Sequence, residues 1–491
     1  MGGVVSRHVQ SCAGEPLRLR RGDAFLCFAL AALFYACPAS AETLQDALSN
    51  AYLVNPLLNA ERAKLRATDE DVSRAKAGMR PFVFGSGDVN FDNTQTSVSP
   101  SRSGSLETFG TDESLATDGI THPRGYAVQL TQPIFRGFRH LNAIRQAKAS
   151  VQAGRESLRT IEQTTLLDAV TAYVNVVRDQ AIVRLRENNV TVLTEQLKAT
   201  RDRFEVGEVT RTDVAQAEAR RSDALSQLAA AQANLKASRA SYQQVVGHPP
   251  SHLLKPPSIF HLLPSTLDEA MTLGDGEHPL ILTTVYREEA SLYAVNRIVG
   301  ELLPEVTLEA QYQKRFELNK ILDDQEETRV TGRLNVPFYQ GGEVAARVRQ
   351  AKETNNQLKR EVESARLSVH ADVVSNWGIL QSSGSQIAAA KASVEANRIA
   401  LNGVREEEKV GQRTTLDVLN AQLEALASQI DLVTALRDRI VAEYSLYAAI
   451  GRLDAQSLGL SVPYYDPIEH YDRVKNKLFG LKPPPPPAPD E

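Results

Sequence analysis

The chain has 491 residues, a formal net charge of −5 and 23% charged residues, so it lacks the basic excess of a nucleic-acid-binding protein. Its length exceeds that of one average domain, and an aromatic content of only 6% argues against one large mixed core. Ala, Gln, Leu, Glu, Arg and Ser dominate long stretches, which is typical of long helices and coiled coils.

The segment 1–41 has the three parts of a secretory signal peptide. A basic stretch precedes an apolar run at 24–36, and a small-residue cleavage site follows. We predict cleavage after Ala41, which makes Glu42 the first mature residue. All three cysteines lie in this leader, so the mature chain can form no disulfide. A lipidated N-terminus at Cys37 is the alternative, although the bulky residues before it suit a lipoprotein site poorly.

The mature sequence is an internal duplication. Asn55-Pro56 and His278-Pro279 lie 223 residues apart, and further along the chain the offset becomes 204. Pairs that keep the second offset include Pro133 with Pro337, Arg145 with Arg349, Gly207 with Gly411, Asp213 with Asp417 and Gly247 with Gly451. The first copy therefore carries 19 extra residues, within a polar segment at 93–119 that is typical of an exposed loop.

The duplication divides the chain into four parts. The signal peptide (1–41) is followed by a first repeat (42–260) and a second repeat (261–452), each expected to contain a helix, a β-hairpin and a long helix pair. The remainder (453–491) is expected to form a C-terminal strap against the exterior of the long helices. It ends in a proline-rich tail that we expect to be extended.

Each copy contains two short segments that alternate as half-buried strands do. The clearest covers Val306 to Gln313, and others lie at 126–131, 330–336 and, less regularly, 82–91. No apolar run after the leader reaches the roughly 18 residues that a transmembrane helix needs, so any membrane-spanning part must use these strands. Four strands cannot close a barrel, so such a sheet would require several chains. A small soluble sheet explains the alternation equally well.

Long helices are expected after each hairpin. A proline and a glycine mark the junctions at 133–137 and 337–341, and we expect strand pairing to end at these prolines. Helical sequence then runs without proline to Gly207 and Gly411, over about 65–70 residues or roughly 100 Å. The second helix of each pair has the apolar spacing of a coiled-coil seam, as in Leu419, Leu423, Leu426, Ile430 and Val433.

The two turns between the long helices have matching sequences. Gly207 and Gly411 suit the left-handed residue that ends a helix. Asp213 and Asp417 lie in the first turn of the next helix, where the dipole stabilises a carboxylate. Candidate N-caps are Thr210, Thr212, Thr414 and Thr415. This structural role would explain both aspartates, and it does not exclude a second role.

These turns resemble the periplasmic-tip turns of the TolC family of outer-membrane export ducts. The matching residues include Arg203, Gly207, Thr212, Asp213, Gly411, Arg413, Thr414 and Asp417, and the resemblance extends from Glu42 to about Leu453. It implies an α+β, mainly α fold of long antiparallel helical hairpins (an α-barrel). It also implies four transmembrane β-strands per chain, which would contribute to a 12-stranded β-barrel in a homotrimer.

The resemblance also implies a function and partners. The protein would be a passive, non-enzymatic duct of the Gram-negative outer membrane with a long periplasmic extension, serving type I protein secretion or multidrug efflux. A periplasmic adaptor (membrane fusion) protein and an inner-membrane ABC or RND-type transporter would recruit it. Outer-membrane lipid would surround it, with no role for nucleic acid. The adaptor would contact the tip turns at Gly207, Thr210, Gly411 and Thr414.

The resemblance places a gate at the tips. Asp417 would lie on an aperture ring that attracts cations, and Arg413 would reach Thr212 and Asp213 in a latch. Asn420 stands where the family has a second ring aspartate, and Glu408 where it has a latch tyrosine. A Glu408–Arg413 ion pair is therefore an alternative latch, worth only a fraction of a kcal/mol if exposed.

Two other classes of protein stay open. A secreted structural coiled coil or adhesin would use the same helices, and fractionation would separate it from a duct. A periplasmic enzyme is disfavoured, because the sequence contains no catalytic constellation, metal-ligand spacing, phosphate-binding loop or cofactor motif.

Overall fold

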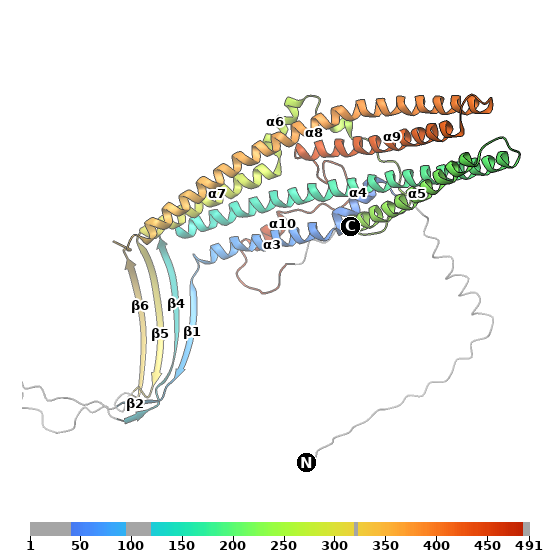
Figure 1. Cartoon of the computed structure of the whole chain (residues 1–491). Coiled ribbons are helices and arrows are strands. Elements are labelled where there is room, and N and C mark those ends of the chain that lie inside the picture. Colours follow the sequence, from blue (N-terminus) through green and yellow to red (C-terminus); the bar gives the residue numbers. More distant parts are fainter. Residues whose placement is uncertain (1–40, 95–118, 319–322, 485–491) are drawn as a thin grey trace, which may run out of the picture.

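The computed structural model describes residues 41–94, 119–318 and 323–484. Long helices run away from one end of a four-stranded sheet, and none of the described helices covers either face of that sheet (Figure 1). The predicted signal peptide apart from its last residue, most of the predicted polar loop and the end of the proline-rich tail lie outside the described residues.

The sheet has four strands, two from each copy of the duplication. Its order is β1 (Phe82–Val89), β4 (Arg124–Arg136), β5 (Glu305–Phe316) and β6 (Asp324–Asn335), with every neighbouring pair antiparallel. The four predicted strands are thus confirmed. A separate two-stranded sheet of β2 (Asp92–Thr94) and β3 (Gly119–Thr121) follows β1, and the sequence pattern does not predict it.

The prediction that strand pairing ends at Pro133 is wrong. β4 continues to Arg136, with a register shift just after the proline in its pairing with β5. β1 pairs with β4 only as far as Thr131, so the residues beyond have one neighbouring strand and tolerate the missing N–H of proline. In the second copy β6 does end at Asn335, before Pro337.

The register gives the sheet one apolar and one polar face. Paired residues of neighbouring strands point to the same face, and successive residues of a strand point to opposite faces. One row across the sheet is Val83, Leu130, Ala310 and Val330, whereas the adjacent row on the other face is Phe84, Gln129, Gln311 and Arg329. The side chains of Val83 and Val330 are 61% and 68% exposed, so nothing in the described chain covers the apolar face.

Two very long helices dominate the fold. α4 (Arg139–Glu205) and α8 (Glu343–Lys409) have 67 residues each, as predicted, which corresponds to about 100 Å. Each turns back into a shorter antiparallel helix, α5 (Arg211–Val246) or α9 (Thr415–Ala449). The other helices are α2 (Leu44–Val54), α3 (Pro56–Ala77), α6 (Leu267–Glu277), α7 (Pro279–Val299), α10 (Glu469–Val474) and the short 3-10 turns η2 (Phe260–Leu262) and η3 (Gly300–Leu302).

In both copies, the helix that precedes the first strand is capped in the same way. Asn55 Oδ1 accepts hydrogen bonds from the N–H groups of Leu57 and Leu58 at the start of α3. His278 Nδ1 accepts one from the N–H of Leu280 at the start of α7. Burial lowers the pKa of His278 to about 4, so its ring stays neutral and keeps this acceptor.

The main core lies where α2, α4, α5, α8 and α9 meet, near the C-terminal ends of α5 and α9. Its largest fully buried side chains include Tyr173, Tyr242, Leu44, Leu48, Leu446 and Ile450. Because both copies contribute to this one cluster, it fixes the two helix pairs to each other at this level.

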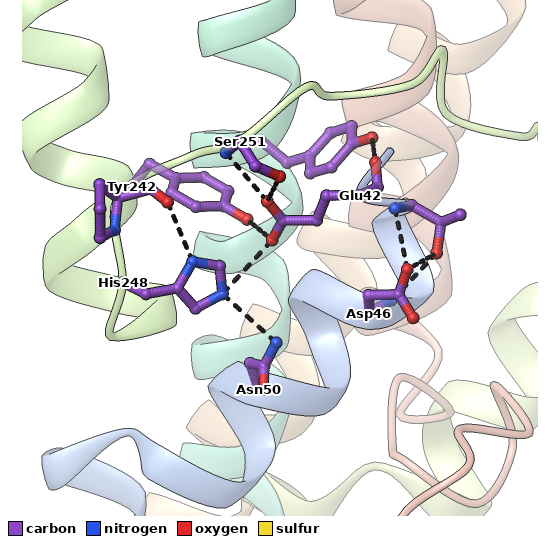
Figure 2. A network of polar contacts seen from close by, with 9 residues as sticks. Glu42, Asp46, Asn50, Tyr242, His248 and Ser251 are labelled. Carbon is purple, nitrogen blue, oxygen red and sulfur yellow. Dashed lines mark hydrogen bonds and ion pairs between the residues drawn. The ribbon is translucent and has the colours of Figure 1, made fainter. Parts of the chain in front are cut away.

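Glu42, the first residue of the predicted mature chain, is buried beside this core (Figure 2). Its carboxylate accepts hydrogen bonds from Tyr242 Oη and from the Ser251 N–H (3.2 Å) and Oγ (3.0 Å), and His248 Nε2 lies 3.4 Å away. Its carbonyl accepts a hydrogen bond from Tyr173 Oη at 2.9 Å. These contacts attach the start of the mature fold to α4 and α5.

The segment after α9 packs along α3. His470 Nδ1 in α10 lies 2.9 Å from the Asp69 carboxylate, and both side chains are buried. The N–H of Tyr465 donates to Tyr52 Oη at 3.0 Å. This is the segment predicted to be a strap, and its place on the exterior of a tunnel stays a prediction.

Candidate gate at the helical tips

The two tip turns share one backbone geometry. Gly207 and Gly411 have φ of +79° and +77°, in the left-handed region. The N–H of Gly207 donates to the Phe204 carbonyl at 3.0 Å, and that of Gly411 donates to the Glu408 carbonyl at 2.9 Å. An added Cβ would meet no atom within 4 Å at either glycine, so the backbone angle rather than space requires glycine here.

Each turn then begins its next helix with a capping box. The Thr210 side chain accepts from the Asp213 N–H at 3.3 Å, and the Asp213 carboxylate accepts from the Thr210 N–H at 2.9 Å. Thr414 and Asp417 make the same pair of bonds at 3.2 and 3.0 Å. Thr210 and Thr414 are therefore the caps among the four candidates.

The capping bonds also keep both aspartates ionised. Hydrogen bonds from the Thr210 side chain and backbone lower the pKa of Asp213. Hydrogen bonds from the Thr414 backbone and side chain, with Arg413 nearby, lower the pKa of Asp417. The charge that a cation ring requires is thus present on Asp417 at neutral pH.

The prediction of a Glu408–Arg413 ion pair is wrong within the chain. Glu408 Oε1 lies 3.3 Å from Arg203 Nη1 and accepts a hydrogen bond from Thr415 Oγ1 at 3.1 Å, with its side chain only 12% exposed. Arg413 Nε instead lies 2.9 Å from Glu407 Oε2. Adjacent residues of a helix point about 100° apart, so Glu408 faces α4 while Glu407 faces the turn and can contact Arg413.

Arg413 makes no contact with Thr212 or Asp213 within the described chain, where its ion-pair partner is Glu407. A latch from Arg413 to these residues would have to form between neighbouring helix pairs of different chains, and it stays a prediction. The ring role of Asp417 stays a prediction for the same reason.

Asn420 links the two helix pairs of one chain. Its Oδ1 accepts a hydrogen bond from Arg220 Nη2 of α5 at 2.9 Å. Nearby, Gln422 Nε2 of α9 donates to Asn189 Oδ1 of α4 at 3.2 Å in a buried position. Sequence reasoning missed Arg220, Asn189 and Gln422, because no local pattern shows which residues 200 or more positions apart meet.

Neither a metal site nor a membrane-spanning helix is found in the described ranges. No group of three or more His, Cys, Asp or Glu side chains is placed there to hold an ion. Likewise, no helix in the same part of the chain is both long and apolar enough to cross a membrane.

Known proteins share this architecture and sequence. The family profile "Outer membrane efflux protein" matches residues 45–248 and 276–452. The outer membrane efflux protein BepC of Brucella suis is 41% identical over 447 residues, covering 91% of this chain and 93% of the relative. Outer membrane protein TolC of Escherichia coli K12 is 25% identical over 436 residues, covering 86% and 84%. The Campylobacter jejuni CmeC outer membrane channel has the same fold (TM-score 0.74, 14% identity, 88% and 89% covered).

Long helical hairpins, a small sheet with one apolar face and polar turns at the far end make up the fold that the chain shares with outer-membrane channels. The chain belongs to the outer membrane efflux protein family, a family of channel proteins. Its place is the Gram-negative outer membrane, with the helices as a periplasmic extension. The comparisons do not support the alternative of a secreted coiled coil or adhesin.

Proposed function

We propose that three copies of the chain form a passive duct for type I secretion or multidrug efflux. The two edge strands of the sheet, β1 and β6, each have a neighbour on one side only. Unpaired edges are not tolerated in a bilayer, so the sheet must continue into other chains. Three copies would supply twelve strands, an even number that closes a barrel of ordinary size.

The two-faced sheet is the observation that carries this proposal. The row through Val83, Leu130 and Val330 would face lipid, and the row through Gln129, Gln311 and Arg329 would line a water-filled lumen. A soluble sheet would cover its apolar face with helices, whereas here the helices leave from one end (Figure 1).

The tips would be the gate of this duct. Within a chain, the Arg203–Glu408 and Arg220–Asn420 contacts would hold α8 and α9 against α4 and α5 in the closed state. Asp417 would form the charged aperture ring, and Arg413 would contact Thr212 and Asp213 of a neighbouring chain. Opening would separate the helix pairs at their exposed ends, where ion pairs are weak.

The duct would depend on partners for energy and selectivity. A periplasmic adaptor would contact the exposed turns at Gly207, Thr210, Gly411 and Thr414, and an inner-membrane ABC or RND-type transporter would load the substrate. We propose no catalytic activity and no cofactor for the chain itself.

Adjacent residues of β6 provide a matched test. Val330→Lys places a charge on the apolar face, at a cost of about 2–4 kcal/mol near the bilayer midplane, whereas Thr331→Lys places it on the polar face opposite Glu309. We expect wild type and Thr331→Lys to fractionate with the outer membrane as SDS-resistant trimers, and Val330→Lys to fail. A soluble monomer for the wild type, or equal behaviour of the two variants, would contradict the proposal.

A further inference from the structure

An arginine-lined cavity lies where the sheet meets the helices. Its volume is 270 Å³, and the end of β4, the start of α4, the region of α7 and η3, and the start of α8 contribute to it. These elements converge at one end of the sheet in Figure 1. The charged and titratable residues of this cavity, called the arginine pocket below, are Arg136, Arg139, His140, Arg297, Glu301 and Arg347.

Carboxylates form ion pairs with three of the four arginines. Glu305 forms ion pairs with Arg136 and with Arg139, whose Nη2 lies 2.8 Å away. Arg347 Nη1 lies 2.7 Å from Glu301 and 3.5 Å from Glu343. Arg297 has neither an ion pair nor a side-chain hydrogen bond to any residue of the described chain. The pocket therefore offers one uncompensated guanidinium beside three that are already held in place.

His140 adds a second unused polar group. Its Nε2 is buried and has no hydrogen-bond partner among the residues that the structure describes. The ring is fixed against Gly78, where an added Cβ would lie 2.5 Å from Nδ1. Burial, with Arg136 and Arg139 nearby, lowers the pKa of His140, so the ring is neutral and can donate one N–H.

The duplication shows that this pocket is not a general feature of the junction. At the offset of 204, Gln340, Glu343 and Val344 stand where the first copy has Arg136, Arg139 and His140. The counterpart of Arg297 at the offset of 223 is Arg74, which pairs with Asp71 at 2.9 Å. One of the two junctions in each chain thus concentrates positive charge, and the other does not.

We propose that the arginine pocket binds a phosphate group through Arg297, with His140 and the neighbouring guanidinium groups as further donors. Guanidinium presents paired N–H donors that match two phosphate oxygens. A volume of 270 Å³ accommodates a phosphate with several waters, each of which occupies about 30 Å³ in the liquid.

The source of the phosphate rests on the proposed function. If the sheet spans the outer membrane, its junction with the helices lies at the periplasmic membrane surface, where phospholipid headgroups are present. A soluble phosphate compound in the periplasm or the duct presents the same chemistry, so the experiment must separate the two.

The test uses the full mature protein purified in detergent, with bound lipids counted by native mass spectrometry. Phosphatidylglycerol is compared with diacylglycerol of the same acyl chains, and inorganic pyrophosphate serves as a soluble competitor. We expect Arg297→Gln to weaken phosphatidylglycerol binding about tenfold, equivalent to about 1.4 kcal/mol. Arg360→Gln removes the same charge from α8, outside the lining of the pocket, and should leave the binding unchanged. Melting temperatures of both variants show whether they fold.

Competition by pyrophosphate at equal concentration would assign the site to soluble phosphates, and retention of the lipid would assign it to headgroups. The proposal is overturned if diacylglycerol binds as well as phosphatidylglycerol, or if folded Arg297→Gln and Arg360→Gln behave alike. It is also overturned if a carboxylate of a neighbouring chain crosslinks to a lysine placed at 297. Failure of the proposed trimeric duct can be distinguished from failure of the phosphate site, because pyrophosphate binding can also be measured on a monomer.

Discussion

Carboxylates connect the helices both at the core and at the tips, but in different surroundings. In the core, Glu443 is 1% exposed and accepts bonds from Arg439 Nε at 2.8 Å, Ser258 Oγ at 2.7 Å and the Ile259 N–H at 3.1 Å. At the tip, the Arg203–Glu408 pair is longer, at 3.3 Å, and its arginine is 34% exposed. Arg203 also pairs with Glu208 of the same turn at 2.7 Å, and the Glu208 side chain is 57% exposed.

This contrast separates a fixed body from a movable end. Removing one partner from a buried, fully bonded charge leaves the others unsatisfied and is strongly destabilising, whereas exposed pairs contribute little. The tips can therefore change their contacts at small cost while the core keeps the helix pairs together.

The largest effect is expected in the core. Glu443→Ala leaves Arg439, Ser258 and the Ile259 N–H without their acceptor, and should lower the free energy of unfolding by about 3–5 kcal/mol. Denaturant or thermal unfolding measures the loss. Glu395→Ala, which removes an exposed pair with Arg398 on α8, is the control and should leave stability nearly unchanged.

The next effect depends on pH. Because the pKa of His278 falls from its ordinary 6.5 to about 4, the unfolded state binds more protons between these values. Stability should then rise with pH through this window and be lost as the pH falls below 6.5, by up to about 3 kcal/mol. His278→Asn copies the Asn55 cap of the first repeat, and should flatten this part of the stability curve. An unchanged slope would show that His278 is not the responsible group.

A smaller effect on stability is expected at the latch. Arg203→Gln removes both the contact to Glu408 and the closer pair with Glu208 in the same turn, and should cost no more than about 1 kcal/mol because both are partly exposed. In planar bilayers it should nevertheless raise the conductance of the closed channel, and Glu408→Gln should do the same. Arg398→Gln, whose partner Glu395 lies on the same helix, should leave conductance unaltered. Equal conductance in all three variants would exclude this latch.

The smallest change in stability accompanies a test of the ring. Asp417→Asn and Asp213→Asn remove the same charge from equivalent capping boxes, so their effects on the helix ends should match. Only Asp417→Asn should reduce cation selectivity or block by divalent cations, measured as a reversal-potential shift at low salt. Equal selectivity in both variants would remove the ring assignment.

Local features of this protein can be predicted from neighbouring residues alone. The alternation of Val306 to Gln313, the prolines and glycines at the junctions and the Thr-x-x-Asp boxes each depend on residues within a few positions. The strands and the long helices could therefore be predicted, whereas four threonines remained candidates for the two caps. The duplication was visible for the same reason, because matching local patterns recur at constant offsets.

Contacts between residues far apart in the sequence depend on how the helices and strands pack. The sequence suggests a pair of Glu408 with Arg413, but Glu408 contacts Arg203, which lies 205 positions away. A helix turns by about 100° per residue, and helix packing sets which of its side chains face α4. For the same reason, the sequence does not predict the Arg220–Asn420 hydrogen bond, the contacts that bury Glu42 or the arginine pocket. Strand pairing continues past Pro133 because β1 pairs with β4 only as far as Thr131, so the proline has a neighbouring strand on one side only. This is a property of the assembled sheet rather than of the proline.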